Sequence, residues 1–408
     1  MMLNELPLLH GRPQRSIFIG TSVIFTVLFF SFVSFLHYSR LPDRQTRDWT
    51  SSFTRPKPST GLLRDIYNET LRFQEILVIN LPSRTDHKDA FVLSSALTGI
   101  KGTFVDGVDG KDVPEKALPP RHGEYVMPAG NRGSWRAHLN AIQRIVTENL
   151  ESALIVEDDV DWDIRIKSQL HHFADAVHVL TQPLASDREE VRPEDVYIGP
   201  ESPAPRTLKP ERSPYGDNWD MLWLGHCGVR FPEKEKDGNL PRNRVLFRDE
   251  TVPSSQHFGL QFGTDELVKH YANHTRAVHR TAETVCSLAY AITQRSARQI
   301  LYDIGLKELR GPYDIMLREY CDGIGGRKVK NCYTAQPQYF QHHRPVGSKR
   351  KNSDINSDEE GEEEFNQHAH TYNIRWSTRL NMQRLSLKIS GQTMRPLRIG
   401  HIDFQNET

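Results

Sequence analysis

The chain has 408 residues, enough for one large domain or two ordinary ones. Its 52 Lys and Arg residues balance its 52 Asp and Glu residues. A nucleic-acid-binding surface needs a basic excess, so no nucleic-acid partner is expected. Hydrophobic residues make up 37% of the chain, which suits a folded core combined with polar segments outside it.

An uncharged apolar stretch, Ile17–Leu36, lies near the amino terminus. At about 1.5 Å per residue, a helix of this length spans about 30 Å, the thickness of a bilayer core. A cleaved signal peptide usually has a shorter apolar region and a small-residue cleavage site. We therefore expect an uncleaved transmembrane signal anchor. Arginines flank both of its ends, so charge leaves the orientation open. The short tail, residues 1–16, and the large polar body favour a type II protein with a cytoplasmic tail.

Residues 37–72 are polar and contain several prolines, which predicts a stem between the membrane and a folded body. Asn68 and Asn273 each begin an acceptor sequon for N-glycosylation, and a third sequon lies at the extreme carboxyl terminus. These sequons favour a lumenal body on the secretory pathway, in the Golgi apparatus or the endoplasmic reticulum.

Four cysteines follow in the body: Cys227, Cys286, Cys321 and Cys332. In an oxidising lumen they allow up to two disulfides, in three connectivities. Cys321 and Cys332 form the natural local pair. Four buried free thiols remain an alternative, because pairing cannot be read from sequence alone.

The first half of the body alternates strands with helices. Hydrophobic patterning predicts strands at Glu75–Leu81, Thr103–Val108 and Ala153–Val156, and helices at Thr85–Leu97 and Gly133–Asn149. Elements of these types in alternation indicate an α/β fold around a mostly parallel sheet.

The second half is less regular. Residues 181–217 contain seven prolines and many charges, which predicts a long surface loop or insertion. A strand is expected at Trp219–Leu224, and a strand followed by a helix within Thr284–Asp303. Residues 357–366 are strongly acidic and predict a disordered, solvated loop. Residues 367–408 form a carboxyl-terminal extension.

The most informative segment is Glu157–Asp163, which places five carboxylates directly after a buried strand. Packed together they repel one another unless a cation is present. Oxygen ligands suit a hard divalent ion such as Mn²⁺ or Mg²⁺. In an extended chain the alternate acids from Glu157 onward share one side, and Asp158 lies opposite. We therefore expect Glu157, Asp159 and Asp161 to be metal ligands. A solvated acidic turn in front of the next helix is the alternative.

Two residues are placed to meet a nucleotide, and a histidine lies on a helix further along the sequence. A nucleotide in an open α/β sheet lies outside the carboxyl ends of the strands. Asn80 and Arg84 follow the first strand, and an arginine can bind phosphate as a fork. The alternative is an ordinary strand-to-helix turn with the arginine on the surface. His138 lies on a predicted helix, where a lone histidine is more often packed or solvent-facing than functional.

Asp314 follows a Gly-Pro turn and is a candidate general base for deprotonating an acceptor hydroxyl. The alternative is a helix cap. One of His342 and His343 could add an imidazole to the metal site, although neighbours on a strand point apart. The sequence has neither a Walker A lysine motif nor a dinucleotide glycine fingerprint, which disfavours nucleotide hydrolases and dehydrogenases.

An ordered set of motifs resembles glycosyltransferase family 25. The first half of the resemblance rests on Ile79-Asn80-Leu81 with Arg84 and Asp86, Val105–Gly110, Gly133 with His138, and Leu154–Asp159. The second half rests on Ala289–Thr293, Pro312–Asp314 and Ser353–Ile355. The set covers roughly residues 75–356, and we place the catalytic domain at 73–356.

The resemblance implies a GT-A-like nucleotide-diphospho-sugar transferase fold, a UDP-sugar donor and usually Mn²⁺. It assigns Glu157, Asp158 and Asp159 to the metal and nucleotide block, with Asn80, Arg84 and His138 on the donor side. Two departures concern the donor contacts: His87 and Lys88 stand where the family commonly has arginine, and Ala137 stands where it usually has serine.

These features together predict a metal-dependent transferase. It would move a sugar, with galactose as the first guess, to a hydroxyl on a glycan or glycoprotein acceptor, with inversion. Asp159 and Asp314 are the expected catalytic residues. Two other classes stay open: an inactive relative that binds carbohydrate or acts as a scaffold, and a metal-dependent phosphoesterase using the same carboxylates.

Overall fold

The structure is a computed structural model that describes residues 63–185, 193–355 and 363–389. The predicted tail, the anchor at 17–36 and most of the stem lie outside these ranges, as do most of the acidic loop and residues 390–408. Among the described residues, no helix is both long and apolar enough to cross a membrane.

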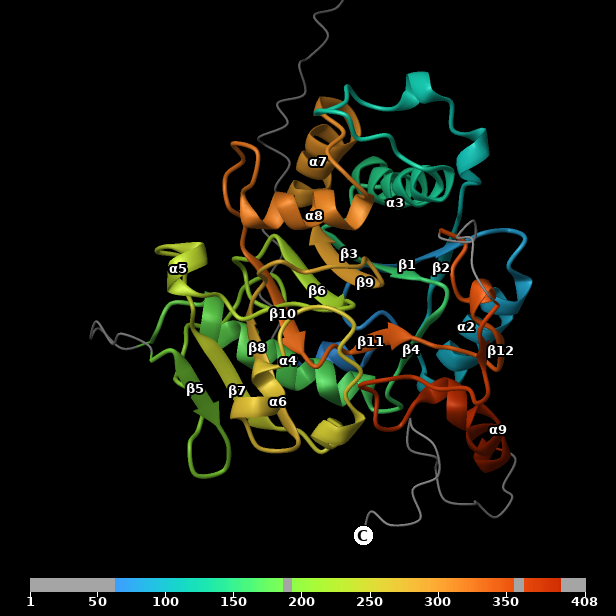
Figure 1. The fold of residues 1–408 in the computed structure, drawn as a ribbon. Coiled ribbons are helices and arrows are strands. Elements are labelled where there is room, and N and C mark those ends of the chain that lie inside the picture. The colour runs from blue at the N-terminus through green and yellow to red at the C-terminus, as the bar shows by residue number, and fades with distance from the viewer. Residues whose placement is uncertain (1–62, 186–192, 356–362, 390–408) are drawn as a thin grey trace, which may run out of the picture. The chain divides into compact units, whose positions relative to one another are not determined.

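An eleven-stranded sheet runs through the body in the order β2-β1-β3-β9-β6-β10-β8-β7-β5, with β11 and β4 joined to its middle (Figure 1). The strands are β1 (Glu75–Asn80), β2 (Thr103–Asp106), β3 (Ser152–Glu157), β4 (Val160–Trp162), β5 (Asp195–Ile198), β6 (Met221–Gly225), β7 (Arg244–Arg248), β8 (Thr275–Arg280), β9 (Ala289–Thr293), β10 (Cys332–Gln336) and β11 (Phe340–His342). The strands predicted around Glu75, Thr103, Ala153, Trp219 and Ser287 are therefore confirmed as β1, β2, β3, β6 and β9.

The expectation of a mostly parallel sheet holds for only part of the sheet. Of the ten strand pairs in the described part of this sheet, five are parallel and five are antiparallel. The fold is mixed α/β. The parallel run β2-β1-β3 comes from the alternating first half of the body. Strand β9 enters next to β3 in the opposite direction, because it arrives from a distant loop and not through a helical crossover.

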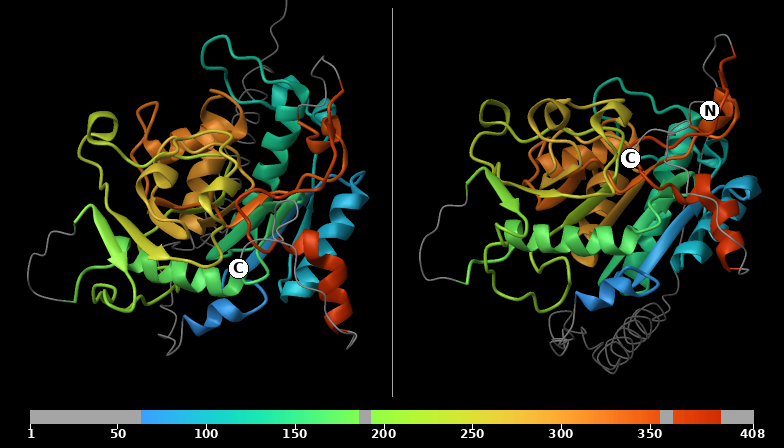
Figure 2. Two further views of the ribbon diagram at one scale, coloured as in Figure 1. Left: turned by 60° about the horizontal axis from the view of Figure 1, so that its bottom comes forward. Right: turned by 90° about the horizontal axis from the view of Figure 1, so that it is seen from below.

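Helices cover both faces of the sheet (Figures 1 and 2). They are α2 (Thr85–Thr98), α3 (Ala129–Thr147), α4 (Ile166–Thr181), α5 (Lys234–Asp237), α6 (Glu266–His270), α7 (Gln294–Tyr302), α8 (Tyr313–Asp322) and α9 (Thr378–Ile389). Side chains alternate along β3: Leu154 and Val156 pack in the core that contains α4, whereas Ala153 and Ile155 pack in the core beneath α3, α7 and α8. Strand β3 is thus buried on both faces, as its apolar run predicts.

Two helix predictions can be compared directly. The helix expected at Thr85–Leu97 is confirmed as α2, and it ends at Gly99, whose φ of 64° is the left-handed conformation of a helix C-cap. The helix expected from Gly133 begins four residues earlier, at Ala129, directly after Pro128. Its first turn packs closely: a Cβ added to Gly130 would lie 2.2 Å from the carbonyl oxygen of Ile355.

The proline-rich 181–217 segment is more than a surface loop. Outside residues 186–192, which the structure does not describe, it supplies β5, which pairs in parallel with β7 at the edge of the sheet. It also buries Tyr215, whose hydroxyl donates to the carbonyl oxygen of Leu71 at 2.8 Å. The predicted acidic loop also contains ordered residues: Phe365–Asn366 forms a short strand, β13, paired with β12 (Gly347–Ser348).

Both possible disulfides are formed. Cys321–Cys332 confirms the local pairing, and Cys227–Cys286 forms the second bridge. This second bridge ties the chain just beyond β6 to the segment that leads into β9.

Candidate functional site

The candidate site lies in the acidic turn between β3 and β4. Glu157 is the last residue of β3, and Asp158 and Asp159 form the turn. Strand β11 pairs with β4 in antiparallel register, with His342 opposite Val160. This pairing brings a histidine from the far end of the chain beside the turn.

Glu157, Asp159 and His342 form a group that can hold a metal ion: each offers one ligand atom, and these atoms lie within 4.8 Å of one another. Nε2 of His342 is 3.6 Å from Oδ2 of Asp159. The other carboxylate oxygen of Asp159, Oδ1, is buried and has no hydrogen-bond partner among the described residues. A buried carboxylate oxygen without a donor is costly unless a cation completes it, so the donor set fits a divalent metal.

The surroundings of this group favour an ionised Asp159 and a neutral His342. Burial would raise the pKa of Asp159, but His342 and Arg344 reverse the effect and hold it below its ordinary value. Burial lowers the pKa of His342, so the imidazole is neutral at pH 7 and has a lone pair to offer. An ionised carboxylate beside a neutral imidazole is the protonation state that metal binding requires.

A buried network of hydrogen bonds orients Glu157. Its Oε1 accepts from the hydroxyl of Ser287 at 2.8 Å and lies 3.3 Å from Nε2 of His138. Nδ1 of His138 is 3.0 Å from the hydroxyl of Tyr290, which bonds to the hydroxyl of Tyr313 at 2.7 Å. The His138 ring also stacks on Tyr313 with centroids 4.4 Å apart. His138 was expected to touch the donor; it is 1% exposed and instead positions Glu157.

Asp158 points to the other side, as the alternation predicts. Its carboxylate accepts from Nδ2 of Asn80 at 2.6 Å and pairs with Nδ1 of His87 at 2.9 Å. Burial raises the pKa of Asp158 in spite of the His87 contact. Asn80 also donates to the carbonyl oxygen of Arg84 at 3.0 Å, so these residues link the acidic turn to the end of β1.

Arg84 lies at the predicted position but its charge is already paired. Its guanidinium forms ion pairs with Asp86 at 3.0 Å and with Asp354 at 2.5 Å. Burial would lower its pKa, but the hydrogen bonds and charges of these two carboxylates reverse the effect and raise it. A phosphate reaching Arg84 would therefore compete with Asp354. The Asp354 contact explains why the distant Ser353–Ile355 motif lies beside the first strand.

The structure contradicts the expectation that Asp161 is a metal ligand. Its side chain is fully buried, and Oδ2 accepts from the hydroxyls of Thr371, at 2.7 Å, and Ser377. Oδ1 accepts from the backbone N–H groups of Trp162 at 2.8 Å and Arg379 at 3.1 Å. The carboxylate of Asp161 is thus stabilised by four donors, three of which come from the carboxyl-terminal extension.

That extension also fixes the acidic turn. The guanidinium of Arg379 donates to the carbonyl oxygen of Val160 at 3.0 Å and to that of Asp158 at 2.5 Å. The backbone N–H of His343 donates to the carbonyl oxygen of Asp159 at 2.9 Å. We call residues 371–379 the clamp, because they hold the turn and its first strand residues in one conformation.

Asp314 lies in the first turn of α8, which begins after Pro312, so it is not the helix cap. Its Oδ2 accepts from the backbone N–H of Cys286 at 2.8 Å. Ser287, the next residue, contacts Glu157. The 286–287 segment thus contacts both Asp314 and Glu157, and the side chain of Asp314 is half-buried. The two predicted glycosylation residues, Asn68 and Asn273, are both exposed.

Sequence reasoning missed Ser287, Arg344 and the clamp. Each lies more than a hundred residues from Glu157, and no local pattern marks any of them. His342 carried a signal in its His-His pair, but the partner strand that aims it was not predicted.

Part of the chain is similar to known proteins. Residues 73–199, which contain β1, the acidic turn and the donor-side residues, match the model of glycosyltransferase family 25 (LPS biosynthesis protein). Procollagen galactosyltransferase 2 of Homo sapiens is 25% identical over 207 residues, covering 46% of this chain and 31% of the relative. Procollagen galactosyltransferase 1 of Danio rerio is 27% identical over 121 residues, covering 27% of this chain and 20% of the relative.

A further relative is named as probably inactive. Probable inactive glycosyltransferase 25 family member 3 of Bos taurus is 26% identical over 140 residues, covering 31% of this chain and 24% of the relative. The chain thus spans less than a third of the length of these relatives. The matched segment carries the acidic turn together with Asn80, Arg84 and His138, and over this segment the chain is similar to glycosyltransferase family 25.

Proposed function

We propose that this chain is a metal-dependent glycosyltransferase of GT-A-like architecture. It moves a sugar, galactose in the first instance, from a UDP-sugar to a hydroxyl on a glycan or glycoprotein, with inversion. The observation that carries the proposal is the Glu157–Asp159–His342 group with its unpartnered buried carboxylate oxygen. The family relationship supports the choice of sugar transfer over other metal-dependent chemistry.

The metal site would be held by Glu157, Asp159 and His342. A bound Mn²⁺ or Mg²⁺ supplies Lewis-acid stabilisation of the charge that develops on the leaving nucleoside diphosphate. His138 and Ser287 hold the Glu157 carboxylate in place, and the clamp holds the backbone carbonyl group of Asp158. Preorganised ligands avoid reorganisation during the reaction, which is where such a site gains most of its rate.

The donor nucleotide would lie at the carboxyl ends of β1 and β3, next to Asn80, Arg84 and Asp158. Open α/β sheets bind nucleotides at this edge. Arg84 is already oriented there by Asp86, and exchange of Asp354 for a phosphate oxygen would keep its charge paired.

Asp314 is the candidate general base. Its second carboxylate oxygen would accept the proton of the acceptor hydroxyl. The hydroxyl oxygen would then attack the anomeric carbon while the nucleoside diphosphate leaves from the opposite face. The Cys286 N–H holds the first oxygen and thereby orients the second.

We also propose that the protein is a type II membrane protein of the Golgi or endoplasmic reticulum with its body in the lumen. Two disulfides, two exposed sequons and the apolar 17–36 stretch support this location. Accessibility of Asn68 and Asn273 to glycosidase on intact microsomes, compared with detergent-opened ones, tests it. Digestion without detergent would contradict a lumenal body.

The experiment that tests the function is calorimetric titration of UDP into the full chain, with and without Mn²⁺, beside Asp159→Asn. We expect metal-dependent binding that the variant loses. UDP-sugar turnover with release of a glycosylated acceptor would then separate transfer from hydrolysis. Absence of UDP binding under every metal condition would overturn the proposal.

The second candidate is an inactive relative that binds carbohydrate, since family members with this description are among the matches. Metal-dependent UDP binding without turnover of any UDP-sugar would favour it. The complete Glu157–Asp159–His342 group favours the enzyme.

A further inference from the structure

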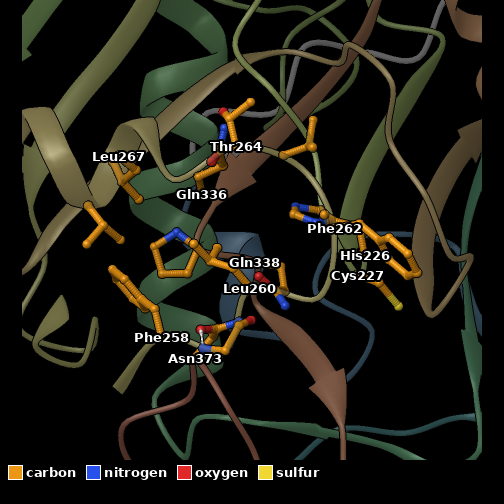
Figure 3. Close-up of a pocket in the computed structure, with 15 residues that line it drawn as sticks. His226, Cys227, Phe258, Leu260, Phe262, Thr264, Leu267, Gln336, Gln338 and Asn373 are labelled. Atoms are coloured by element: carbon orange, nitrogen blue, oxygen red, sulfur yellow. Dashed lines mark hydrogen bonds between the residues drawn. The ribbon is translucent and has the colours of Figure 1, made fainter. Parts of the chain in front are cut away.

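A hollow lies at the end of β6, at the same edge of the sheet as the acidic turn (Figure 3). Its walls are the 226–229 segment after β6, the loop 258–264, helix α6 and the 336–338 segment, with Asn373 at its rim. We call it the β6 hollow. None of its lining residues is Asp, Glu, Lys or Arg. Its one titratable ring, His226, is neutral at pH 7, because burial lowers its pKa to about 4.

The β6 hollow is preformed. The side-chain amide of Asn373 holds Gly259 from both sides, accepting from its N–H at 3.0 Å and donating to its carbonyl oxygen at 3.2 Å. The N–H of Phe262 donates to the carbonyl oxygen of Cys227 at 3.1 Å. A Cβ on Gly228 would lie 2.2 Å from the Phe262 carbonyl group, so loop and strand end touch backbone to backbone. A rigid, neutral recess is typical of a ligand site.

Two polar atoms on its walls lack partners among the described residues. His226 is 3% exposed; its Nε2 lies 3.0 Å from the carbonyl oxygen of Ala335 and so carries the proton. Its Nδ1 is therefore a buried acceptor without a donor. The hydroxyl of Thr264 is also buried and without a partner. A buried acceptor beside a free hydroxyl fits a ligand that carries hydroxyl groups.

Apolar side chains complete the recess. Phe262 and Leu260 are 53% and 51% exposed, unusually open for side chains of this size, and both line the hollow with Phe258. Two polar atoms and an aromatic side chain match the hydroxyl groups and the apolar face of a sugar ring. A nucleotide or another charged ligand finds no counter-charge on these walls.

The β6 hollow is within reach of the acidic turn. Strands β3 and β6 both pair in antiparallel fashion with β9, so their carboxyl ends lie at one edge with one strand between them. At about 4.8 Å per strand, the two ends are about 10 Å apart. The Cys227–Cys286 bridge joins the wall of the hollow to the residue before Ser287, which contacts Glu157.

We propose that the β6 hollow is an acceptor subsite that takes one hydroxyl-bearing edge of a neutral hexose ring, since its cavity volume of about 30 Å³ admits a hydroxyl group and leaves the rest of the ring over the opening; His226 Nδ1 and Thr264 Oγ1 bond to this edge, and Phe262 contacts the apolar face of the ring. The role of the hollow as an acceptor subsite rests on the proposed function, whereas the binding of a neutral sugar there does not depend on it. The subsite would thus select acceptors that already carry an uncharged sugar.

The test is ligand-observed NMR titration of the metal-free full chain with methyl β-galactoside and methyl β-glucoside. Their per-O-methylated counterparts have the same rings without hydroxyl donors. We expect at least one glycoside to bind and its methylated counterpart to fail, because the buried His226 acceptor needs a donor. Equal binding of both forms would reduce the hollow to an apolar patch and overturn the proposal.

Two variants locate the binding. Thr264→Val keeps the side-chain shape and removes the hydroxyl, and Phe262→Ala removes the aromatic wall; each should weaken glycoside binding about tenfold. Tyr197→Ala is the matched control, since Tyr197 is 56% exposed on β5 and does not line the hollow. Unchanged binding in both variants would contradict the assignment.

UDP titration with Mn²⁺ on the same variants separates the two proposals. Retained UDP binding with lost glycoside binding supports both. Glycoside binding that depends on Thr264 and Phe262, without any UDP binding, leaves the sugar subsite standing and removes the donor site. UDP binding without glycoside binding leaves the donor site standing and overturns the sugar subsite.

Discussion

The carboxyl ends of β3 and β6 lie at the same edge of the sheet, separated by β9, yet they carry opposite chemistry. The end of β3 gathers carboxylates, and one oxygen of Asp159 has no donor among the residues that the structure describes. Within the same part of the chain, the end of β6 has no charged lining, and two of its neutral polar atoms have no partner. Because β3 and β6 run in the same direction, their ends form two neighbouring sites. The chemistry of the first suits a cation, and that of the second suits an uncharged ring.

A second contrast lies within the acidic segment itself. Asp159 and Asp161 are two residues apart and both carboxylates are shielded, but Asp161 has four donors from the protein. Asp159 keeps an oxygen without one. Burial therefore does not distinguish a structural carboxylate from a functional one; the missing donor does.

The strongest test of the comparison is Asp159→Asn. It should lower turnover by about 10²–10³-fold, because a charge that stabilises the leaving group is lost without loss of volume. Glycoside binding in the β6 hollow should stay unchanged, since the hollow does not use this residue. Steady-state kinetics and the NMR titration measure the two effects, with the exposed Asp112→Asn as control. Turnover equal to that of the native protein would refute the metal site.

Asp161→Ala should act on stability. The substitution removes the buried carboxylate that accepts from the Thr371 and Ser377 hydroxyls and from the Arg379 N–H, which costs about 3 kcal/mol. Metal-free Asp159→Asn should cost less, about 1 kcal/mol, because it removes the attraction between this carboxylate and Arg344 and leaves a side chain of the same size. Chemical denaturation of both proteins measures the difference. Similar losses in both would erase the contrast between the two carboxylates.

His342→Gln should weaken Mn²⁺ binding by about 10–100-fold while leaving the fold intact, because one of three ligands is lost. Electron paramagnetic resonance of free Mn²⁺ gives the affinity without any need for turnover. His122→Gln, on an exposed histidine, is the matched control. An unchanged affinity would show that His342 is not the third metal ligand.

The smallest effect concerns a carboxyl outside both regions. Burial raises the pKa of Asp322 from 3.8 to about 6, whereas Asp159, among cationic groups, shifts downward. The folded state therefore binds a proton more tightly than the unfolded state between these values. This contribution to stability is present below pH 3.8 and is lost as the pH rises through about 6.

Asp322→Asn should remove that contribution. We expect the native protein to gain about 2 kcal/mol relative to the variant when the pH falls from 7 to 4.5. Denaturant titrations of both proteins at the two pH values measure the difference. A difference of the opposite sign would show that Asp322 is paired with a cation in the folded state.

The sequence by itself determined the local framework of this protein. Apolar runs and turn residues predicted β1, α2 and β3 within one or two residues, because these elements follow from side-chain periodicity. The strand-end position of Glu157 and Asp159, and the nearby pair Cys321–Cys332, followed from neighbours in the chain.

Only the tertiary structure decided which polar groups meet. The antiparallel entry of β9, the pairing of β11 with β4 and the return of the clamp to Asp161 are contacts between segments far apart in the chain. Their partners are chosen by packing over the whole sheet, which no local pattern records. For this reason the sequence favoured Asp161 as a ligand, whereas the fold satisfies Asp161 with protein donors and brings His342 to the metal-competent group.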